Sequence, residues 1–377
     1  MAASAARLLG PRVRAGLVVS AEPASVPHGF ELIVGGHPVP TADSEAGGRR
    51  ALAIADGMAP DETLLVLLSG GASALMAVPA DGVTLDDKRA TTARLLRGGA
   101  DIHALNTVRK HLSAIKGGWL AAHARGTCRT LVISDVVGDD LSVIASGPTV
   151  GDASRFQDAL DVLGRFGGEA EYPPAVVARL RRGADAGVPE TPTPGDPRLA
   201  RTDTTLIGSR RDAMSGVATA ASALGYQVLR IDDAVVGEAR AAARAHLRAV
   251  LARAADVGRP SCVVSSGETT VHVTGHGKGG RNQEFALAAA QLLAESGAGR
   301  SPVAIASAGT DGVDGPTDAA GAVADATTVA RARAARLAPD RFLFDNNAYA
   351  FFDALGDLIH TGPTGTNVGD LQIILLA

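Results

Sequence analysis

The chain has few cysteines, few aromatic residues and no long apolar run. Its two cysteines, Cys128 and Cys262, are too few for a disulfide framework and lack metal-ligand spacing. Each lies beside a strand-like run, so we interpret them as small buried hydrophobic residues in a reducing compartment. No apolar stretch reaches the roughly 18 residues that a transmembrane helix needs, and the N-terminus lacks a signal-peptide pattern. We therefore expect a cytoplasmic protein without a membrane partner.

Net charge also excludes a class of partner. The formal net charge is −4 and the isoelectric point is about 6.1, which argues against a nucleic acid as the main ligand. Hydrophobic residues make up 46% of the 377 residues, which is enough material for the cores of two domains.

Short apolar runs alternate with longer helical patterns. This rhythm predicts an α/β domain with a mostly parallel sheet. The predicted strands are 16–20, 64–68, 131–134, 204–207, 227–231, 262–265, 269–274, 303–307 and 371–376. The predicted helices are 86–97, 102–115, 156–166, 211–224, 237–255, 282–296, 324–335 and 347–358.

The domain boundary is predicted near residues 256–260. This gives domains of 1–256 and 257–377. The proline-rich stretch 189–197 cannot be a helix or a central strand, and we interpret it as a surface crossing within the first domain because the alternation of strands and helices continues after it.

The most informative motif is the glycine-rich, cationic stretch 275–284, which leads into an apolar helical pattern. Glycines allow a close approach to a ligand, and a helix N-terminus presents free N–H groups. With Lys278 and Arg281, the stretch could hold a phosphate or a carboxylate. It matches neither the Walker loop nor the dinucleotide fingerprint, and a flexible turn with exposed charges is the alternative.

Other polar loops follow predicted strands, where ligands bind in α/β sheets. The small residues of 69–73 suit a nest of backbone amides around an anion, or else a tight turn. Asp135 follows the third strand and could hold Mg²⁺ or accept a proton, whereas Asp139 or Asp140 could cap a short helix.

Cations gather on the predicted helix 102–115 and just beyond it. Arg109 and Lys116 fall near one another on one face, with Lys110 about a third of a turn away. The alternative is that these cations complement the helix dipole. Further polar loops at 265–269, 308–318 and 361–370 lie in the second domain, and so many loops at strand ends indicate a shared cleft.

Taken together, these stretches resemble the two-domain glycerate 2-kinases, whose C-terminal module is called the MOFRL domain. The matching motifs cover nearly the whole chain in order. They are 36–40, 69–75, 99–103 with 106–118, 134–149, 237–240, 275–284, 309–320 and 361–370.

The resemblance implies transfer of the ATP γ-phosphoryl group to the 2-hydroxyl of D-glycerate, with Mg²⁺. It also implies a larger Rossmann-like α/β/α domain, a smaller C-terminal α/β domain, and an active site in the cleft between them. Arg281 is our first candidate for the cation at the transferring phosphoryl group or the glycerate carboxylate. Asp135 and Lys116 are the other catalytic candidates, and Asp135 with Asp139 the candidate metal ligands. The substrate and nucleotide candidates are Ser69, Gly70, Gly71, Ser73, Asn106, Arg109, Lys110, Ser146, Gly147, Glu268, Lys278, Gly280, Asn282, Glu284, Asp311, Thr364 and Asn367.

The sequence departs from the family pattern in three places. The family begins with a further strand and a Gly-Lys-Ala loop whose lysine is implicated in catalysis, so we expect this chain to be N-terminally truncated. Ser266 stands where the family usually has glycine, and Arg210 where asparagine is common.

Two other functions stay open at this stage. Members of the family have been labelled hydroxypyruvate reductases, although the sequence has no dinucleotide fingerprint. A ligand-binding protein without turnover would follow from the absent lysine. The sequence leaves the oligomeric state open, a homodimer included.

Overall fold

The computed structural model describes residues 1–253, 258–295 and 302–377, and the chain divides into two compact units. Unit 1 comprises Met1–Val132 and Asp139–Ile207. Unit 2 comprises Ile133–Gly138 and Gly208–Ala377. Each unit is described by itself below.

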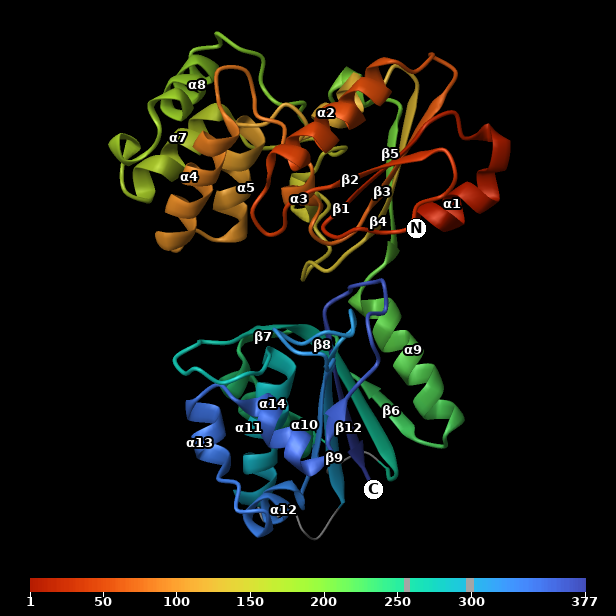
Figure 1. Ribbon diagram of the computed structural model, residues 1–377, viewed down its shortest axis with the longest axis vertical. Helices are drawn as coiled ribbons and strands as arrows, with labels where there is room; N and C mark the ends of the chain where they lie inside the picture. Colours follow the sequence, from red (N-terminus) through yellow and green to blue (C-terminus); the bar gives the residue numbers. More distant parts are fainter. Residues whose placement is uncertain (254–257, 296–301) are drawn as a thin grey trace. The chain divides into compact units, whose positions relative to one another are not determined.

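Unit 1 contains two groups of strands and a set of helices (Figure 1). β1 and β2 pair in parallel, and β3, β4 and β5 follow in that order, with β3 parallel to β4. The strands are β1 (Gly16–Ser20), β2 (Phe30–Val34), β3 (Thr63–Leu68), β4 (Thr127–Ile133) and β5 (Thr202–Gly208). The helices are α1 (Ala2–Leu9), α2 (Ala42–Asp56), α3 (Ala72–Leu75), α4 (Leu85–Arg97), α5 (Ile102–His111), α6 (Trp119–His123), α7 (Phe156–Arg165) and α8 (Pro174–Ala184).

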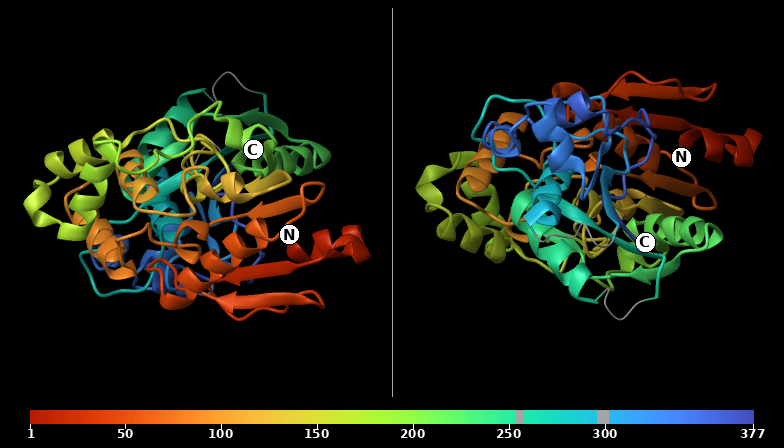
Figure 2. Two further views of the ribbon diagram at one scale, coloured as in Figure 1. Left: turned by 90° about the horizontal axis from the view of Figure 1, so that it is seen from above. Right: turned by 90° about the horizontal axis from the view of Figure 1, so that it is seen from below.

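Unit 1 has a helical core that includes α5. α4, α5, α7 and α8 pack their apolar faces together, and Leu95, Val108, Leu163 and Leu180 are buried in this core. The four helices form one group beside the strands in Figure 1, and the two further views in Figure 2 show the same grouping. This packing holds α4, which carries Lys88, and α5, which carries Arg109 and Lys110.

Unit 2 is built on a mixed sheet with the order β11-β10-β9-β12-β8-β6, and β7 also pairs with β8. β12 runs antiparallel to both β8 and β9, whereas β6 and β7 run parallel to β8. The strands are β6 (Gln227–Arg230), β7 (Val235–Glu238), β8 (Ser261–Thr270), β9 (Val303–Gly309), β10 (Gly321–Asp325), β11 (Leu358–Ile359) and β12 (Asp370–Leu376). The helices are α9 (Arg210–Ala223), α10 (Ala239–Arg253), α11 (Arg281–Glu295), α12 (Thr328–Ala334), α13 (Pro339–Phe344) and α14 (Ala348–Leu355).

The alternation of side chains along β12 explains how helices cover both faces of this sheet. Ile374 and Leu376 join the core beneath α11, whereas Leu371, Ile373 and Leu375 pack on the α9 side. α11 is buried along nearly its whole length, which explains its apolar and alanine-rich sequence.

The predicted α/β class is confirmed, and several elements match their predicted ranges closely. Three predictions were wrong. The strands expected at 262–265 and 269–274 are one strand, β8, and the helix expected at 324–335 begins only after the strand β10. The helix expected at 102–115 ends at His111, because the chain beyond it pairs with the segment around Pro79. The predicted helix ends at 254–255 and 296 lie outside the described residues.

The compact units differ from the domain division expected at 256/257. Gly208–Arg253 packs in unit 2, because β6 pairs with β8 and α10 shares a core with α11. Within residues 1–253, 258–295 and 302–377, no helix is both long and apolar enough to cross a membrane.

Candidate functional site

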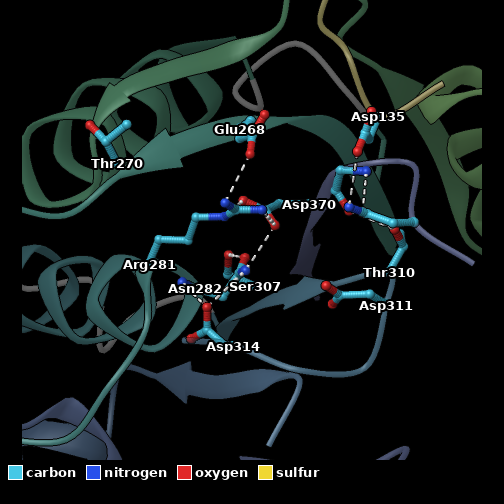
Figure 3. Close-up of polar contacts among 12 residues, drawn as sticks. Asp135, Glu268, Thr270, Arg281, Asn282, Ser307, Thr310, Asp311, Asp314 and Asp370 are labelled. Atoms are coloured by element: carbon cyan, nitrogen blue, oxygen red, sulfur yellow. Dashed lines mark hydrogen bonds and ion pairs between the residues drawn. The ribbon is translucent and has the colours of Figure 1, made fainter. Parts of the chain in front are cut away.

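Arg281 lies at the first turn of α11 and binds two carboxylates of unit 2 (Figure 3). Its Nε donates to Asp370 Oδ2 at 2.7 Å, and its Nη2 donates to Asp370 Oδ1 at 3.0 Å. Its Nη1 donates to Glu268 Oε1 at 2.9 Å. The two-point contact with Asp370 fixes the plane of the guanidinium, because the fork of donors matches the carboxylate.

Strand register brings these groups together. Asp370 is the first residue of β12, and it lies opposite Gly267 on β8 and Gly309 on β9. Because β12 is antiparallel to both neighbours, its start lies beside the carboxyl ends of β8 and β9. The Asp370 carboxylate is fully buried, and the Glu268 side chain is 46% exposed. Arg281 therefore has one buried partner, Asp370, and one accessible partner, Glu268.

The N-terminus of α11 is capped from within the unit. Asp314 accepts hydrogen bonds from the backbone amides of Asn282 and Gln283 at 3.0 and 2.8 Å. Burial raises the pKa of Asp314 to about 6. Gly280 permits this approach, because a Cβ at that position would collide with the Asp314 side chain. A helix N-terminus favours an anion, and here the Asp314 carboxylate supplies it.

Asn282 links this cap to Asp370, the carboxylate that binds Arg281. Its Nδ2 donates to Asp370 Oδ1 at 3.0 Å and to Asp314 Oδ1 at 3.2 Å. Its Oδ1 accepts from the Ser307 hydroxyl at 2.7 Å. All the polar atoms of the buried Asn282 side chain thus have partners, so the geometry of the network is well defined.

The glycine-rich loop before α11 is held by a distant segment, residues 345–347. Asn346 Oδ1 accepts from the amides of Thr274 and Gly275 at 2.8 and 2.9 Å. The amide of His276 donates to Asp345 Oδ1, and that of Lys278 donates to Asn347 Oδ1. A Cβ on Gly275 or Gly277 would collide with the same segment. These amides are therefore engaged within unit 2, which differs from the open anion cradle that the sequence suggests.

Other predicted residues of this stretch have partners in the same unit. Glu284 is buried, where it accepts from Arg240 Nε at 2.6 Å and from Asn346 Nδ2 at 3.1 Å. Glu284 therefore binds Asn346, the residue that holds the loop amides. The Lys278 ammonium lies 4.5 Å from the centre of the Tyr349 ring.

The remaining candidates of unit 2 lie on the loops after β9 and before β12. The Thr364 hydroxyl donates to the Thr310 carbonyl at 2.6 Å, and the Thr364 amide donates to the Asp311 carbonyl at 3.0 Å. Asn367 Nδ2 lies 3.5 Å from Asp135 Oδ2, and Figure 3 shows Asp135 beside these loops. Asp135 belongs to the segment Ile133–Gly138, which packs within unit 2.

In unit 1, a chain of side-chain hydrogen bonds connects three predicted residues. The Ser73 and Ser146 hydroxyls lie 2.9 Å apart, and Ser146 donates to Asn106 Oδ1 at 3.0 Å. Ala145 and Ser146 have φ values of 54° and 60°, the left-handed region that side chains disfavour. Such strain is maintained by the surrounding contacts and is often found at functional sites.

Lys116 extends this chain. Its ammonium donates to the Ser73 carbonyl at 2.7 Å, to the Ser73 hydroxyl at 3.1 Å and to the Ala145 carbonyl at 3.4 Å. Burial, together with the charges of Lys88 and Arg109, holds the pKa of Lys116 well below its usual value. Because α5 ends at His111, Lys116 and Arg109 do not share a helix face, and the helical reasoning that paired them was wrong.

The comparisons with known proteins cover both units. The MOFRL family matches residues 261–370, and a domain of unknown function (DUF4147) matches residues 1–181. A glycerate 2-kinase of Pyrococcus horikoshii is 38% identical over 352 residues, which cover 92% of this chain and 78% of that protein. A D-glycerate 2-kinase of Thermotoga maritima is 39% identical over 382 residues, which cover 100% of this chain and 88% of that protein. The chain belongs to the two-domain glycerate kinase family.

A solved structure agrees with this assignment. The crystal structure of a glycerate kinase from Thermotoga maritima matches with a TM-score of 0.90 and 39% identity, over 100% of this chain and 88% of that one. The predicted resemblance to the glycerate kinase family is thereby confirmed.

The two metal candidates of this glycerate kinase family member fall in different units, Asp135 in unit 2 and Asp139 in unit 1. Asp139 Oδ1 is buried and has no hydrogen-bond partner among the described residues. In the parts of the chain that the structure describes, no three or more His, Cys, Asp or Glu side chains are grouped as a metal site. A shared metal site remains a prediction.

Sequence reasoning missed several residues that the structure places in or beside the candidate sites. Asp370 is the first residue of an apolar strand, and a carboxylate at that position could have indicated a polar site at the start of the strand. Asp314 and Asn346 act through contacts with residues far away in the sequence, which no local pattern reveals. Lys88, buried on α4, was also missed, although a lysine on the apolar face of a helix was a signal.

Proposed function

We propose that the protein is a glycerate 2-kinase that transfers the γ-phosphoryl group of ATP to the 2-hydroxyl of D-glycerate, giving 2-phosphoglycerate. The observation that carries the proposal is the similarity to D-glycerate 2-kinase of Thermotoga maritima along the full chain. The chemistry of the described residues is compatible with it. Phosphoryl transfer depends mainly on positioned cations and metal charge rather than on a protein nucleophile.

Arg281 is the proposed cation at the transferring group. Asp370 keeps the guanidinium oriented through two hydrogen bonds, while Nη1 donates to the accessible Glu268. Burial raises the pKa of Glu268, even though Arg281 opposes this shift. A bound oxyanion can therefore replace Glu268 at Nη1 without disturbing the contact with Asp370. When an oxyanion replaces Glu268 in this way, the Nη1 group of Arg281 donates to the substrate.

Magnesium would be held by oxygen ligands. Mg²⁺ in phosphoryl-transfer sites commonly takes one or two protein carboxylates together with phosphate oxygens. Asp135 is the proposed ligand in unit 2. A second candidate is Asp139, whose buried Oδ1 has no hydrogen-bond partner in the described part of the chain. When bound, the ion would neutralise phosphate charge, while Arg281 orients the transferring group.

The test is a coupled assay for ADP release from ATP and magnesium with D-glycerate, run beside L-glycerate. We expect release that depends on D-glycerate and falls strongly in Arg281→Lys, which keeps the charge but loses the fork. Arg333→Lys is the matched control, because Arg333 is exposed on α12 of the same unit. Equal rates in Arg281→Lys and the unaltered chain would remove Arg281 from the mechanism.

A second function is motivated by the names of two relatives. Two proteins of Agrobacterium vitis called putative hydroxypyruvate reductase are 39% and 37% identical to this chain. Oxidation of NADH or NADPH with hydroxypyruvate, in the absence of ATP, would favour this activity. We expect none, because the sequence lacks the dinucleotide fingerprint.

A further inference from the structure

Unit 1 contains three cations that form no ion pair with any described carboxylate: Lys88, Arg109 and Lys116. Lys88 is 7% exposed and Lys116 is 3% exposed. Lys88 donates to the Val78 carbonyl at 3.3 Å, and Lys116 donates to Ser73 and Ala145. Within residues 1–253, 258–295 and 302–377, none of the three cations forms an ion pair. Arg109 also has no hydrogen-bond acceptor for its side chain in those residues.

One short segment connects the two lysines. Ser113 also donates to the Val78 carbonyl, at 3.0 Å, and Ser113 Oγ accepts from the backbone amide of Lys116 at 3.3 Å. Both lysine side chains thus bind the segment 73–78, Lys116 at Ser73 and Lys88 at Val78. Arg109 affects both, because its charge lowers the pKa values of Lys88 and Lys116.

A neighbouring lysine shows the usual solution for a buried cation. Lys110 is also buried, and its ammonium lies 3.2 Å from the fully buried carboxylate of Asp152. Asp152 in turn accepts from the Thr191 hydroxyl. Among the residues that the structure describes, Lys110 therefore has a carboxylate partner, whereas Lys88, Arg109 and Lys116 have none.

Burial of like charges without a partner is unfavourable. Burial is the main cause that lowers the pKa of Lys88 from 10.5 to about 7, and the charge of Arg109 adds to it. The carboxylate that opposes this shift is Glu45, which already forms an ion pair with Arg49 at 2.6 Å. A purely structural role does not account for the two buried lysines, since an apolar residue would fill each position at a lower cost.

We propose that Lys88, Arg109 and Lys116 form a binding site for an oxyanion of the reactants, either the carboxylate of glycerate or a phosphate of the nucleotide. This inference rests on the proposed function, and it adds Lys88 to the residues that recognise substrate. A bound oxyanion supplies the negative charge that no described residue brings to these three cations. It also accepts hydrogen bonds from the Arg109 guanidinium, which has no acceptor within the described chain.

Lys88→Met tests the site. Methionine has a similar length and no charge, and the Val78 carbonyl keeps its hydrogen bond from Ser113. Arg97→Met is the matched control, because Arg97 is an exposed cation on the same helix. Binding of D-glycerate, inorganic phosphate and a non-hydrolysable ATP analogue to each full-length chain is measured by calorimetry, and thermal midpoints are recorded without ligand.

We expect Lys88→Met to weaken binding of one probe about ten- to a hundredfold, as loss of a hydrogen bond to a charged group does. The thermal unfolding midpoint of the variant should not be lower than that of the unaltered chain. Loss confined to D-glycerate identifies the carboxylate as the ligand. Loss confined to phosphate and the ATP analogue identifies the nucleotide. Arg97→Met should bind all probes like the unaltered chain.

Two results would overturn the inference. One is unchanged affinity for every probe in Lys88→Met, and the other is the absence of saturable binding of any probe to the unaltered chain. Formation of 2-phosphoglycerate is measured separately with the unaltered chain. Unchanged affinities together with product formation reject the site but keep the kinase, whereas anion binding without product rejects the kinase but keeps the site.

Discussion

Replacing Lys88 by methionine removes a buried positive charge while leaving the side-chain volume nearly unchanged. The pKa of Lys88 falls from 10.5 to about 7 in the folded chain, first because of burial and second because of Arg109. Each pKa unit corresponds to about 1.4 kcal/mol, so a shift of roughly 3.5 units corresponds to an upper limit of about 5 kcal/mol.

The sign of the pH dependence follows from proton binding. The unfolded chain keeps the Lys88 proton up to its ordinary pKa of 10.5, whereas the folded chain releases it near pH 7. Between these values the unfolded state binds more protons, so the Lys88 contribution to folding stability becomes more favourable as pH rises. Below pH 7 the penalty is complete, and above pH 10.5 it disappears. The stability advantage of Lys88→Met should therefore be largest near pH 7 and decrease toward pH 10.

Urea denaturation provides the assay. The chain has a single tryptophan, Trp119, which lies on α6 of unit 1, so its fluorescence reports on the unit that contains Lys88. We expect Lys88→Met to be more stable than the unaltered chain by about 2–5 kcal/mol at pH 7, and by less than about 1 kcal/mol at pH 10. A less stable variant at pH 7, or a difference that stays constant with pH, would refute the reasoning about an uncompensated charge.

Other predictions concern the residues that hold the candidate sites. Arg281→Lys should lower kcat/KM for D-glycerate about 10²- to 10³-fold, as measured by ADP release, because the bidentate contact and the directed charge are lost. Asp314→Ala should reduce the free energy of unfolding by about 1–2 kcal/mol in urea titrations, because two amides at the start of α11 lose their acceptor; an unchanged urea midpoint would contradict this. Lys110→Met should lower that free energy by about 3–5 kcal/mol, because it leaves the buried Asp152 carboxylate unpaired. The opposite signs expected for Lys110→Met and Lys88→Met make each lysine a control for the other.

The fold could be predicted wherever local pattern and packing agree. The strand at Gly16–Ser20 was predicted with its observed bounds, because it is a short apolar run between turns. The helix expected at 324–335 was placed too early, because Ala324 and Asp325 belong to the strand β10 and α12 spans Thr328–Ala334. Pairing with β9, which the local sequence does not reveal, places Ala324 and Asp325 in the strand.

The candidate site was predictable in its location but not in its contacts. Polar loops at strand ends pointed to Arg281, Glu268 and Asn282, and the structure places these three residues together in unit 2. The loop 274–278 illustrates the limit. Its amides bind the side chains of 345–347, and the bonded pair Thr274 and Asn346 is separated by 72 positions in the sequence. Glycines that permit this approach look the same in a sequence as glycines that surround a phosphate.

The most direct measurement of the central claim is the identity of the product made from ATP, magnesium and D-glycerate. Phosphorus NMR distinguishes a phosphoryl group on the 2-hydroxyl from one on the 3-hydroxyl. The account predicts 2-phosphoglycerate from the unaltered chain, with strongly reduced formation by Arg281→Lys and normal formation by Arg333→Lys. Exclusive formation of 3-phosphoglycerate, or reduction of hydroxypyruvate by NADH without any phosphoglycerate, would contradict it.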